Sequence, residues 1–93
     1  MQVRTVRVAI TGRVQGVGYR AWTEAEANTR GLSGWVRNRR DGSVEAIFAG
    51  PESALCDMVG ACQDGPPAAK VASIEILDGA EFSGAGFSVL PTA

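Results

Sequence analysis

Histidine is absent from this chain of 93 residues. Without it the chain cannot build Ser–His or Cys–His nucleophile pairs, phosphohistidine intermediates or metal sites based on imidazole. Two cysteines are present, Cys56 and Cys62, and two thiols alone make a poor zinc site. We therefore expect no metal site, and any chemistry must use arginine, asparagine, carboxylates, hydroxyl groups or the backbone.

Long apolar runs and a strong charge of either sign are also missing. No apolar run approaches the ~20 residues that a membrane helix needs, and the N-terminal residues lack the layout of a signal peptide. The net charge is −1 and the pI is about 5.3, whereas proteins that bind nucleic acid usually carry a basic patch. We expect neither a membrane nor a nucleic acid as a partner.

The two cysteines also bear on the compartment. Cys56 and Cys62 fall in a helical pattern at a spacing that points them away from each other, so a mutual disulfide is not expected. A reducing cytoplasm is the expected location. The length, with 45% hydrophobic and 20% charged residues, predicts one globular domain over residues 1–93.

The hydrophobic pattern changes period several times along the chain. Residues 5–11 alternate as in a half-buried strand, and Asp41-Gly42 is a favoured hairpin turn between two further strands. Residues 21–30 predict a helix that ends at Gly31. A second helix from Pro51 carries one apolar stripe, which is formed by Leu55, Met58, Val59 and Cys62.

The order of these elements predicts the fold. The expected elements are strands over residues 5–11, 34–38, 43–49, 71–77 and 86–90, and helices over residues 21–30 and from residue 51 to a break at residues 65–67. The central hairpin requires antiparallel pairing, and two crossover helices must cover one face of a single sheet. We therefore predict an α+β fold of the ferredoxin-like, split βαβ type (βαββαβ), with an antiparallel sheet and two helices packed on one face.

Residues 12–20, GRVQGVGYR, concentrate glycine just before an arginine. Residues 16–21 also fit the dinucleotide pattern G-x-G-x-x-A, but that fold needs a parallel sheet, and Asp41 lies in a hairpin turn instead of ending a parallel strand. We reject that interpretation. A simple turn from strand to helix explains the glycines, but it does not explain Arg20 at a helix entrance, where the helix dipole disfavours a cation.

A third interpretation accounts for Arg20. Backbone amides of residues 15–20, freed by the glycine dihedrals, can converge into a nest that binds an anion at the N-terminus of the helix. The planar guanidinium of Arg20 suits two oxygens of a phosphate. The Gly-Lys-Ser/Thr of a Walker A loop is missing, so the sequence predicts a small oxyanion and no magnesium nucleotide.

Residues 34–46, GWVRNRRDGSVEA, form the second informative stretch. Asn38 ends the expected second strand, and taken alone it is a turn-favouring asparagine. Arg37, Arg39 and Arg40 are expected to be solvated, where they could also raise the local positive potential for an anionic substrate.

Together the two stretches resemble the paired signatures of acylphosphatases. The resemblance covers nearly the whole chain, including the GPP at residues 65–67 and the closing GF. It implies a ferredoxin-like fold and an enzyme that hydrolyses the carboxyl–phosphate bond of a small-molecule acyl phosphate without metal or cofactor. Nothing in the sequence demands more than a monomer.

The resemblance also assigns roles to residues. Arg20 matches the essential arginine of the family, and Asn38 matches its water-positioning asparagine. Where the family usually has phenylalanine this chain has Tyr19, whose ring is expected to pack inward and whose hydroxyl then needs a partner. The family's phosphate-binding loop falls on Gln15, Gly16, Val17, Gly18, Tyr19 and Arg20.

Two other functions compete with hydrolysis. A non-catalytic, anion-binding or regulatory acylphosphatase-like module is the stronger rival, although the presence of both Arg20 and Asn38 favours an enzyme. RNA binding on a fold with the same element order needs aromatic residues on the central strands and a basic face, and this chain offers only Phe48 there. No carboxylate is placed as an obvious base, and Glu24, Glu26 and Glu45 are expected to be solvated.

Overall fold

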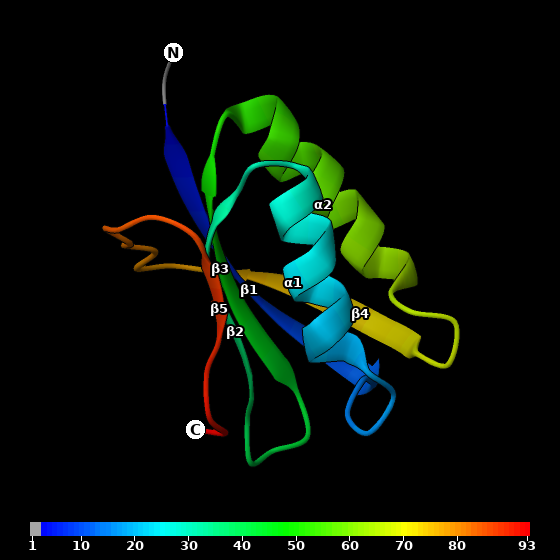
Figure 1. Cartoon of the computed structure of the whole chain (residues 1–93). Helices are drawn as coiled ribbons and strands as arrows, with labels where there is room; N and C mark the ends of the chain where they lie inside the picture. Colours follow the sequence, from blue (N-terminus) through cyan, green and yellow to red (C-terminus); the bar gives the residue numbers. More distant parts are fainter. Residues whose placement is uncertain (1–2) are drawn as a thin grey trace.

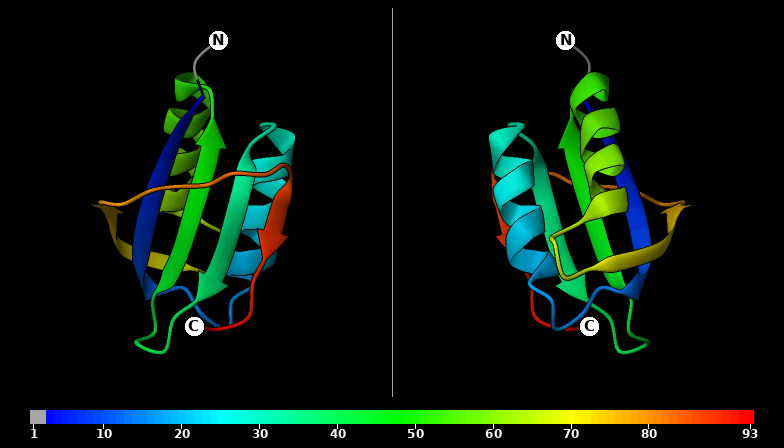
Figure 2. Two further views of the ribbon diagram at one scale, coloured as in Figure 1. Left: turned by 90° about the vertical axis from the view of Figure 1, so that its left-hand side faces the viewer. Right: turned by 90° about the vertical axis from the view of Figure 1, so that its right-hand side faces the viewer.

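One sheet and two helices make up the computed structural model, which describes residues 3–93 (Figure 1). In chain order the elements are β1 (Arg4–Arg13), α1 (Tyr19–Thr29), β2 (Ser33–Asn38), β3 (Val44–Gly50), α2 (Glu52–Asp64), β4 (Lys70–Leu77) and β5 (Phe87–Val89). Both helices lie on the same face of the sheet (Figure 2). The predicted α+β ferredoxin-like fold is confirmed.

The sheet is mixed, so the prediction of an antiparallel sheet is wrong for one strand. The strand order is β4-β1-β3-β2-β5, and β1 pairs antiparallel with both β3 and β4, as β2 does with β3. The short strand β5 instead runs parallel to β2. Residues 78–86 carry the chain from the β4 edge across the uncovered face to the opposite edge (Figure 2), so the last strand arrives beside β2 in the same direction.

The core lies between the sheet and the two helices. The stripe predicted on α2 faces it, since Leu55, Met58 and Cys62 are buried and Val59 packs against them. From the sheet, Phe48 stacks on Phe87 with ring centroids 5.6 Å apart. Burial of these apolar surfaces holds both helices against the strands that carry the loops described below.

Helix α1 ends as predicted but begins earlier. Gly31 adopts φ 69, and the amide of Leu32 donates to the carbonyl of Ala27 at 2.9 Å, which is the signature of a Schellman motif. At the other end the helix starts at Tyr19, two residues before the expected start at residue 21. Arg20 therefore belongs to the first helical turn.

None of the helices in residues 3–93 is long and apolar enough to span a membrane. The two thiols lie in different environments, because Cys56 is exposed and Cys62 is buried in the core. Both cysteines are free.

Candidate active site

A cavity of about 340 Å³ opens where α1 begins and β2 ends. The loop that follows β1, the hairpin of residues 39–43 and the C-terminus all lie at this end of the sheet (Figure 1). The residues that line the cavity are Val14, Gly16, Gly18, Tyr19, Arg20, Ala21, Glu24, Asn38 and Val89. Two stretches that are separate in the sequence therefore form one site.

The glycines of the loop are needed for their backbone conformation. Gly16 has φ 73, and Gly18, the N-cap of α1, has φ 80 and ψ 19, in the left-handed region. A Cβ at either position would meet nothing within 4 Å, so shortage of space is not the reason for glycine. No side chain caps α1, and its first turn contains no acidic residue. Within residues 3–93, the amides at this helix end therefore have no anionic partner from the first helical turn or from a capping side chain.

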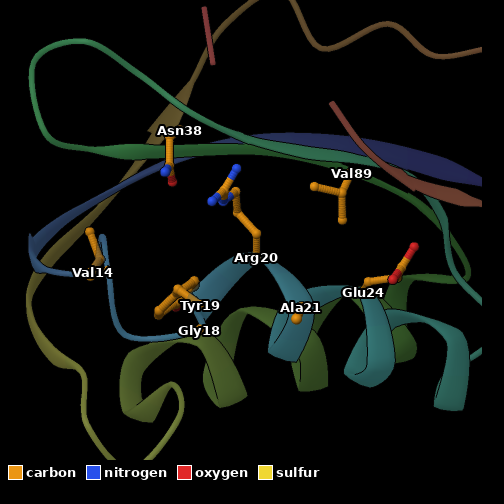
Figure 3. A pocket seen from close by; sticks show the side chains of 9 residues that line it. Val14, Gly18, Tyr19, Arg20, Ala21, Glu24, Asn38 and Val89 are labelled. Carbon is orange, nitrogen blue, oxygen red and sulfur yellow. The ribbon is translucent and has the colours of Figure 1, made fainter. Parts of the chain in front are cut away.

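Arg20 places a cation at this helix end. Its side chain is half-buried and extends from α1 across the cavity toward Asn38 (Figure 3). Arg20 takes part in none of the ion pairs found within residues 3–93. A guanidinium beside the positive end of a helix dipole raises the electrostatic energy unless an anion lies close to both. The arrangement is suited to bind such an anion.

Asn38 faces Arg20 from the opposite wall. It is the last residue of β2, and its side chain points into the cavity (Figure 3). Its backbone is held on both sides, since it pairs with Val44 of β3 and its carbonyl accepts a hydrogen bond from the amide of Ala93 at 3.0 Å. The side-chain amide, which can both donate and accept, is therefore presented from a fixed strand end.

Not every residue of the predicted phosphate-binding loop reaches the cavity. Gly16, Gly18, Tyr19 and Arg20 line it, whereas Gln15 and Val17 do not. The side chain of Val17 packs against the core.

The Gln15 side chain points to the neighbouring hairpin. Its Nε2 donates to the carbonyls of Arg39 and Ser43, each at 2.8 Å.

Tyr19 packs inward, and its hydroxyl has a partner. The residue is only 2% exposed, and Oη donates to the carbonyl of Cys62 at 2.6 Å. The helical donor for that carbonyl would be the amide of residue 66, which is Pro66 and has no N–H. The Tyr19 hydroxyl replaces the missing donor and ties the start of α1 to the end of α2. The expectation for Tyr19 is confirmed.

Burial raises the pKa of the Tyr19 hydroxyl, and it raises the pKa of the Cys62 thiol to about 11. Both groups stay neutral around pH 7. The contact between the two helices is therefore not a source of pH dependence in the neutral range.

Tyr19→Phe should lower stability with little effect on activity. The change leaves the buried Cys62 carbonyl without a donor, which costs about 1–3 kcal/mol. Urea denaturation of the wild type and the variant measures this loss, and kcat/KM for an acyl phosphate should stay within about two-fold. An unchanged denaturation midpoint would show that the hydrogen bond does not contribute to folding.

Known proteins identify the family of the chain. A family model described as Acylphosphatase matches residues 6–89. An acylphosphatase of Bradyrhizobium diazoefficiens is 55% identical over 93 residues, which cover 94% of each chain. The chain belongs to the acylphosphatase family. The predicted family and the predicted acylphosphatase enzyme are thereby confirmed.

Solved acylphosphatase structures show the same architecture. The crystal structure of acylphosphatase from Bacillus subtilis superposes with a TM-score of 0.87 at 41% identity, over 96% of this chain and 99% of that one. An acylphosphatase from Coxiella burnetii gives a TM-score of 0.89 at 27% identity, over 95% and 93% of the two chains. The five-stranded sheet with two helices on one face is thus the fold of solved members of the acylphosphatase family.

Several residues that line the cavity were not predicted from the sequence. Val14, Ala21 and Val89 contribute apolar surface, and they carry no chemical signal that would single them out. Glu24 was expected to be solvated, yet it is half-buried in the cavity wall. It lies four residues after Arg20 on α1, which is the spacing of one helix face, but its carboxylate points away from Arg20 (Figure 3).

The expectation for Glu45 is wrong. Glu45 is only 6% exposed, although it lies on the face of the sheet away from the helices. Its carboxylate accepts a hydrogen bond from Arg37 at 2.9 Å and lies 3.6 Å from Nε of Arg7. Both arginines come from the strands on either side of β3, so cross-strand pairing brings opposite charges together.

Arg37 is held by its contact with Glu45 and by a second contact. Its guanidinium also stacks over the ring of Trp35, 4.7 Å from the centroid. Arg37 is therefore only partly exposed, and it does not line the cavity. Glu26 pairs with Arg30 on α1 at 2.9 Å and is half-buried, away from the cavity.

Metal ligands are not clustered in the part of the chain that the structure describes. Among residues 3–93 no group of three or more Cys, Asp or Glu side chains could hold an ion. The polar groups of the cavity are one guanidinium, one carboxamide, one carboxylate and backbone amides. This set is suited to binding an oxyanion and orienting a water molecule.

Proposed function

We propose that this chain hydrolyses the carboxyl–phosphate bond of acyl phosphates by in-line attack of a water molecule positioned by Asn38. Arg20 and the backbone amides of residues 15–20 hold the phosphoryl group. The observation that carries the proposal is the convergence of Arg20 and Asn38 on one cavity at the uncapped N-terminus of α1. A doubly charged phosphoryl group supplies the anion that both Arg20 and the helix end lack.

The phosphoryl group sits between the loop amides and Arg20 in this mechanism. Two of its oxygens accept hydrogen bonds from the guanidinium fork, and a third faces the amides near Gly16 and Gly18. As the bond to the leaving group lengthens, charge spreads over the phosphoryl oxygens in a loose transition state. Donors that are already in place stabilise this charge without reorganising.

Asn38 orients the attacking water. Its side-chain oxygen accepts a hydrogen bond from the water and its amide group donates one, so a single residue can fix both the place and the direction of a lone pair. The leaving group is a carboxylate, which needs no strong general acid. Among the described residues, Glu24 is the one carboxylate that lines the cavity, and it points away from Arg20 and Asn38 (Figure 3). We therefore assign the proton acceptor to the phosphate of the substrate itself.

The acyl group of the substrate lies against the wall of the cavity away from Asn38. This wall is formed by Ala21, Glu24 and Val89 (Figure 3), and Val89 is 41% exposed. Because this wall is open to solvent at Val89, it can accommodate small acyl groups of varied shape, and the ends of these groups that lie far from the phosphate stay in water.

We propose that the chain acts as a single domain over residues 1–93, as a cytoplasmic monomer, without metal or cofactor and with a small acyl phosphate as its only partner. The absence of histidine and the good leaving group support a reaction that uses positioning and charge stabilisation alone.

The proposal is tested by hydrolysis of benzoyl phosphate in the presence of EDTA. We expect turnover that EDTA leaves unchanged and that inorganic phosphate inhibits competitively. The rival function, a binding module, predicts that phosphate binds, as seen by a rise in the melting temperature, while benzoyl phosphate decays at its spontaneous rate. Activity that disappears with EDTA and returns with a divalent cation would overturn the metal-free mechanism.

A further inference from the structure

The phosphate loop and the hairpin after Asn38 are joined by one side chain. Nε2 of Gln15 donates to the carbonyls of Arg39 and Ser43, and both distances are 2.8 Å. We propose that Gln15 is a positioning residue, which sets the place of Asn38, and of the water it holds, relative to the bound phosphoryl group. This inference rests on the proposed function.

The two ends of this link adjoin the two halves of the site. Gln15 directly precedes Gly16, the first glycine of the loop that lines the cavity. Arg39 directly follows Asn38 in the chain. A displacement at either end of the link is therefore passed to the neighbouring functional residue through one peptide unit.

The hairpin of residues 39–43, to which Gln15 donates, is itself stabilised by hydrogen bonds. The amide of Arg39 donates to the carbonyl of Ser43 at 2.9 Å, and the amide of Gly42 donates to the carbonyl of Arg39 at 3.1 Å. Asp41 closes the turn, because its Oδ1 accepts from the amide and the hydroxyl of Ser43 at 2.9 and 2.6 Å. These hydrogen bonds lower the pKa of Asp41, so the turn stays closed at neutral pH.

The link requires a group with two N–H donors. Both atoms that Gln15 contacts are carbonyl oxygens, which accept hydrogen bonds only, so the amide nitrogen must face them. Glutamate has no donor for them, and methionine of similar length has none either. Because the link is part-buried, each of its hydrogen bonds is stronger than one in open water.

The sheet connects the two halves of the site only indirectly, through β3. The loop follows β1 and Asn38 ends β2, and β3 lies between these strands. The phosphoryl group and the water are thus carried by strands that do not pair with each other. In-line attack depends steeply on geometry, and a misplacement of about 1 Å can cost about 10²-fold in rate. Gln15 spans this gap at the end of the sheet where the reaction is proposed to take place.

The test uses Gln15→Met and Gln15→Ala with benzoyl phosphate as substrate. Gln15→Met retains the length of the side chain and removes both donors, so it separates hydrogen bonding from packing. We expect both variants to lower kcat by about 10-fold while inhibition by inorganic phosphate changes by less than about two-fold. The backbone amides and Arg20 that bind phosphate are unchanged in these variants.

A double-mutant cycle with Asn38→Ala separates positioning from a general structural role. If Gln15 acts through Asn38, Gln15→Met should lower kcat by less than about two-fold once Asn38 is already alanine. Equal losses in the two backgrounds would overturn the proposal. A wild-type kcat for Gln15→Met would also overturn it, as would weaker phosphate inhibition with unchanged kcat, since that result assigns Gln15 to phosphate binding.

A spectroscopic measurement tests the link without relying on turnover. In ¹H–¹⁵N NMR spectra, Gln15→Met should shift the side-chain amide resonances of Asn38 and the backbone amides of residues 39–43, while those of α2 stay in place. If the wild type fails to hydrolyse benzoyl phosphate, the proposed function fails, and these shifts still decide whether Gln15 positions Asn38. Unchanged Asn38 resonances in the variant would overturn the link.

Discussion

Asn38→Ala is expected to lower kcat by about 10²–10³, with KM and phosphate inhibition close to those of the wild type. The side chain is assigned to the attacking water and not to the phosphoryl group, so its loss removes an interaction used for turnover and leaves substrate binding intact. Initial rates on benzoyl phosphate, with inorganic phosphate as the competing ligand, measure both quantities.

The fold should tolerate this change. Asn38 is held by backbone contacts, namely its pairing with Val44 and the hydrogen bond from Ala93, and alanine keeps both. Asn28→Ala is a matched control, because Asn28 is exposed on α1 outside the cavity. It should have wild-type kinetics. If Asn38→Ala kept the wild-type kcat, or lost phosphate inhibition together with turnover, the water-positioning role would be wrong.

Arg20→Ala is expected to abolish phosphate binding and to lower kcat/KM on the order of 10³-fold or more. The guanidinium contacts the phosphoryl group both in the bound substrate and in the transition state, so binding and turnover fall together. Melting curves with increasing inorganic phosphate give an independent measurement. A ligand that binds the folded state raises the melting temperature of the wild type, and the variant should show no such rise.

The loss of activity in Arg20→Ala should not come from unfolding. Arg20 forms no ion pair within residues 3–93, and removal of a cation from a helix N-terminus is worth about 0.3–1 kcal/mol in favour of folding. The variant should therefore be at least as stable as the wild type without phosphate. Arg40→Ala controls for general positive potential, since Arg40 is exposed in the nearby hairpin. If Arg20→Ala still gained stability from phosphate, the assignment of Arg20 would be wrong.

Much of the fold follows from local patterns that a sequence displays directly. The period of apolar residues predicted the buried stripe of α2, and Gly31 with Leu32 predicted the end of α1. The glycines at 16 and 18 indicated a loop with left-handed dihedrals, which the structure contains. Each of these features depends on a few neighbouring residues, so the information for it lies within a short segment of chain.

Features that depend on pairing between distant segments could not be predicted in this way. The direction of β5 depends on the path of residues 78–86 across the open face of the sheet. The burial of Glu45 depends on register, which places Arg7 and Arg37 on either side of it. A change of register by one residue would turn each of these side chains to the other face of the sheet.

Some features of the candidate site follow from local sequence, and others depend on how distant segments pack. The sequence by itself determined the chemistry available, because it contains no histidine and places Arg20 after flexible glycines and Asn38 at a strand end. The tertiary structure alone decided that Arg20 and Asn38 share a cavity, that Glu24 and Val89 help to line it, and that Gln15 points to the hairpin and not to the cavity. Residue type and backbone freedom are local properties, whereas the meeting of two side chains depends on how the sheet and helices pack.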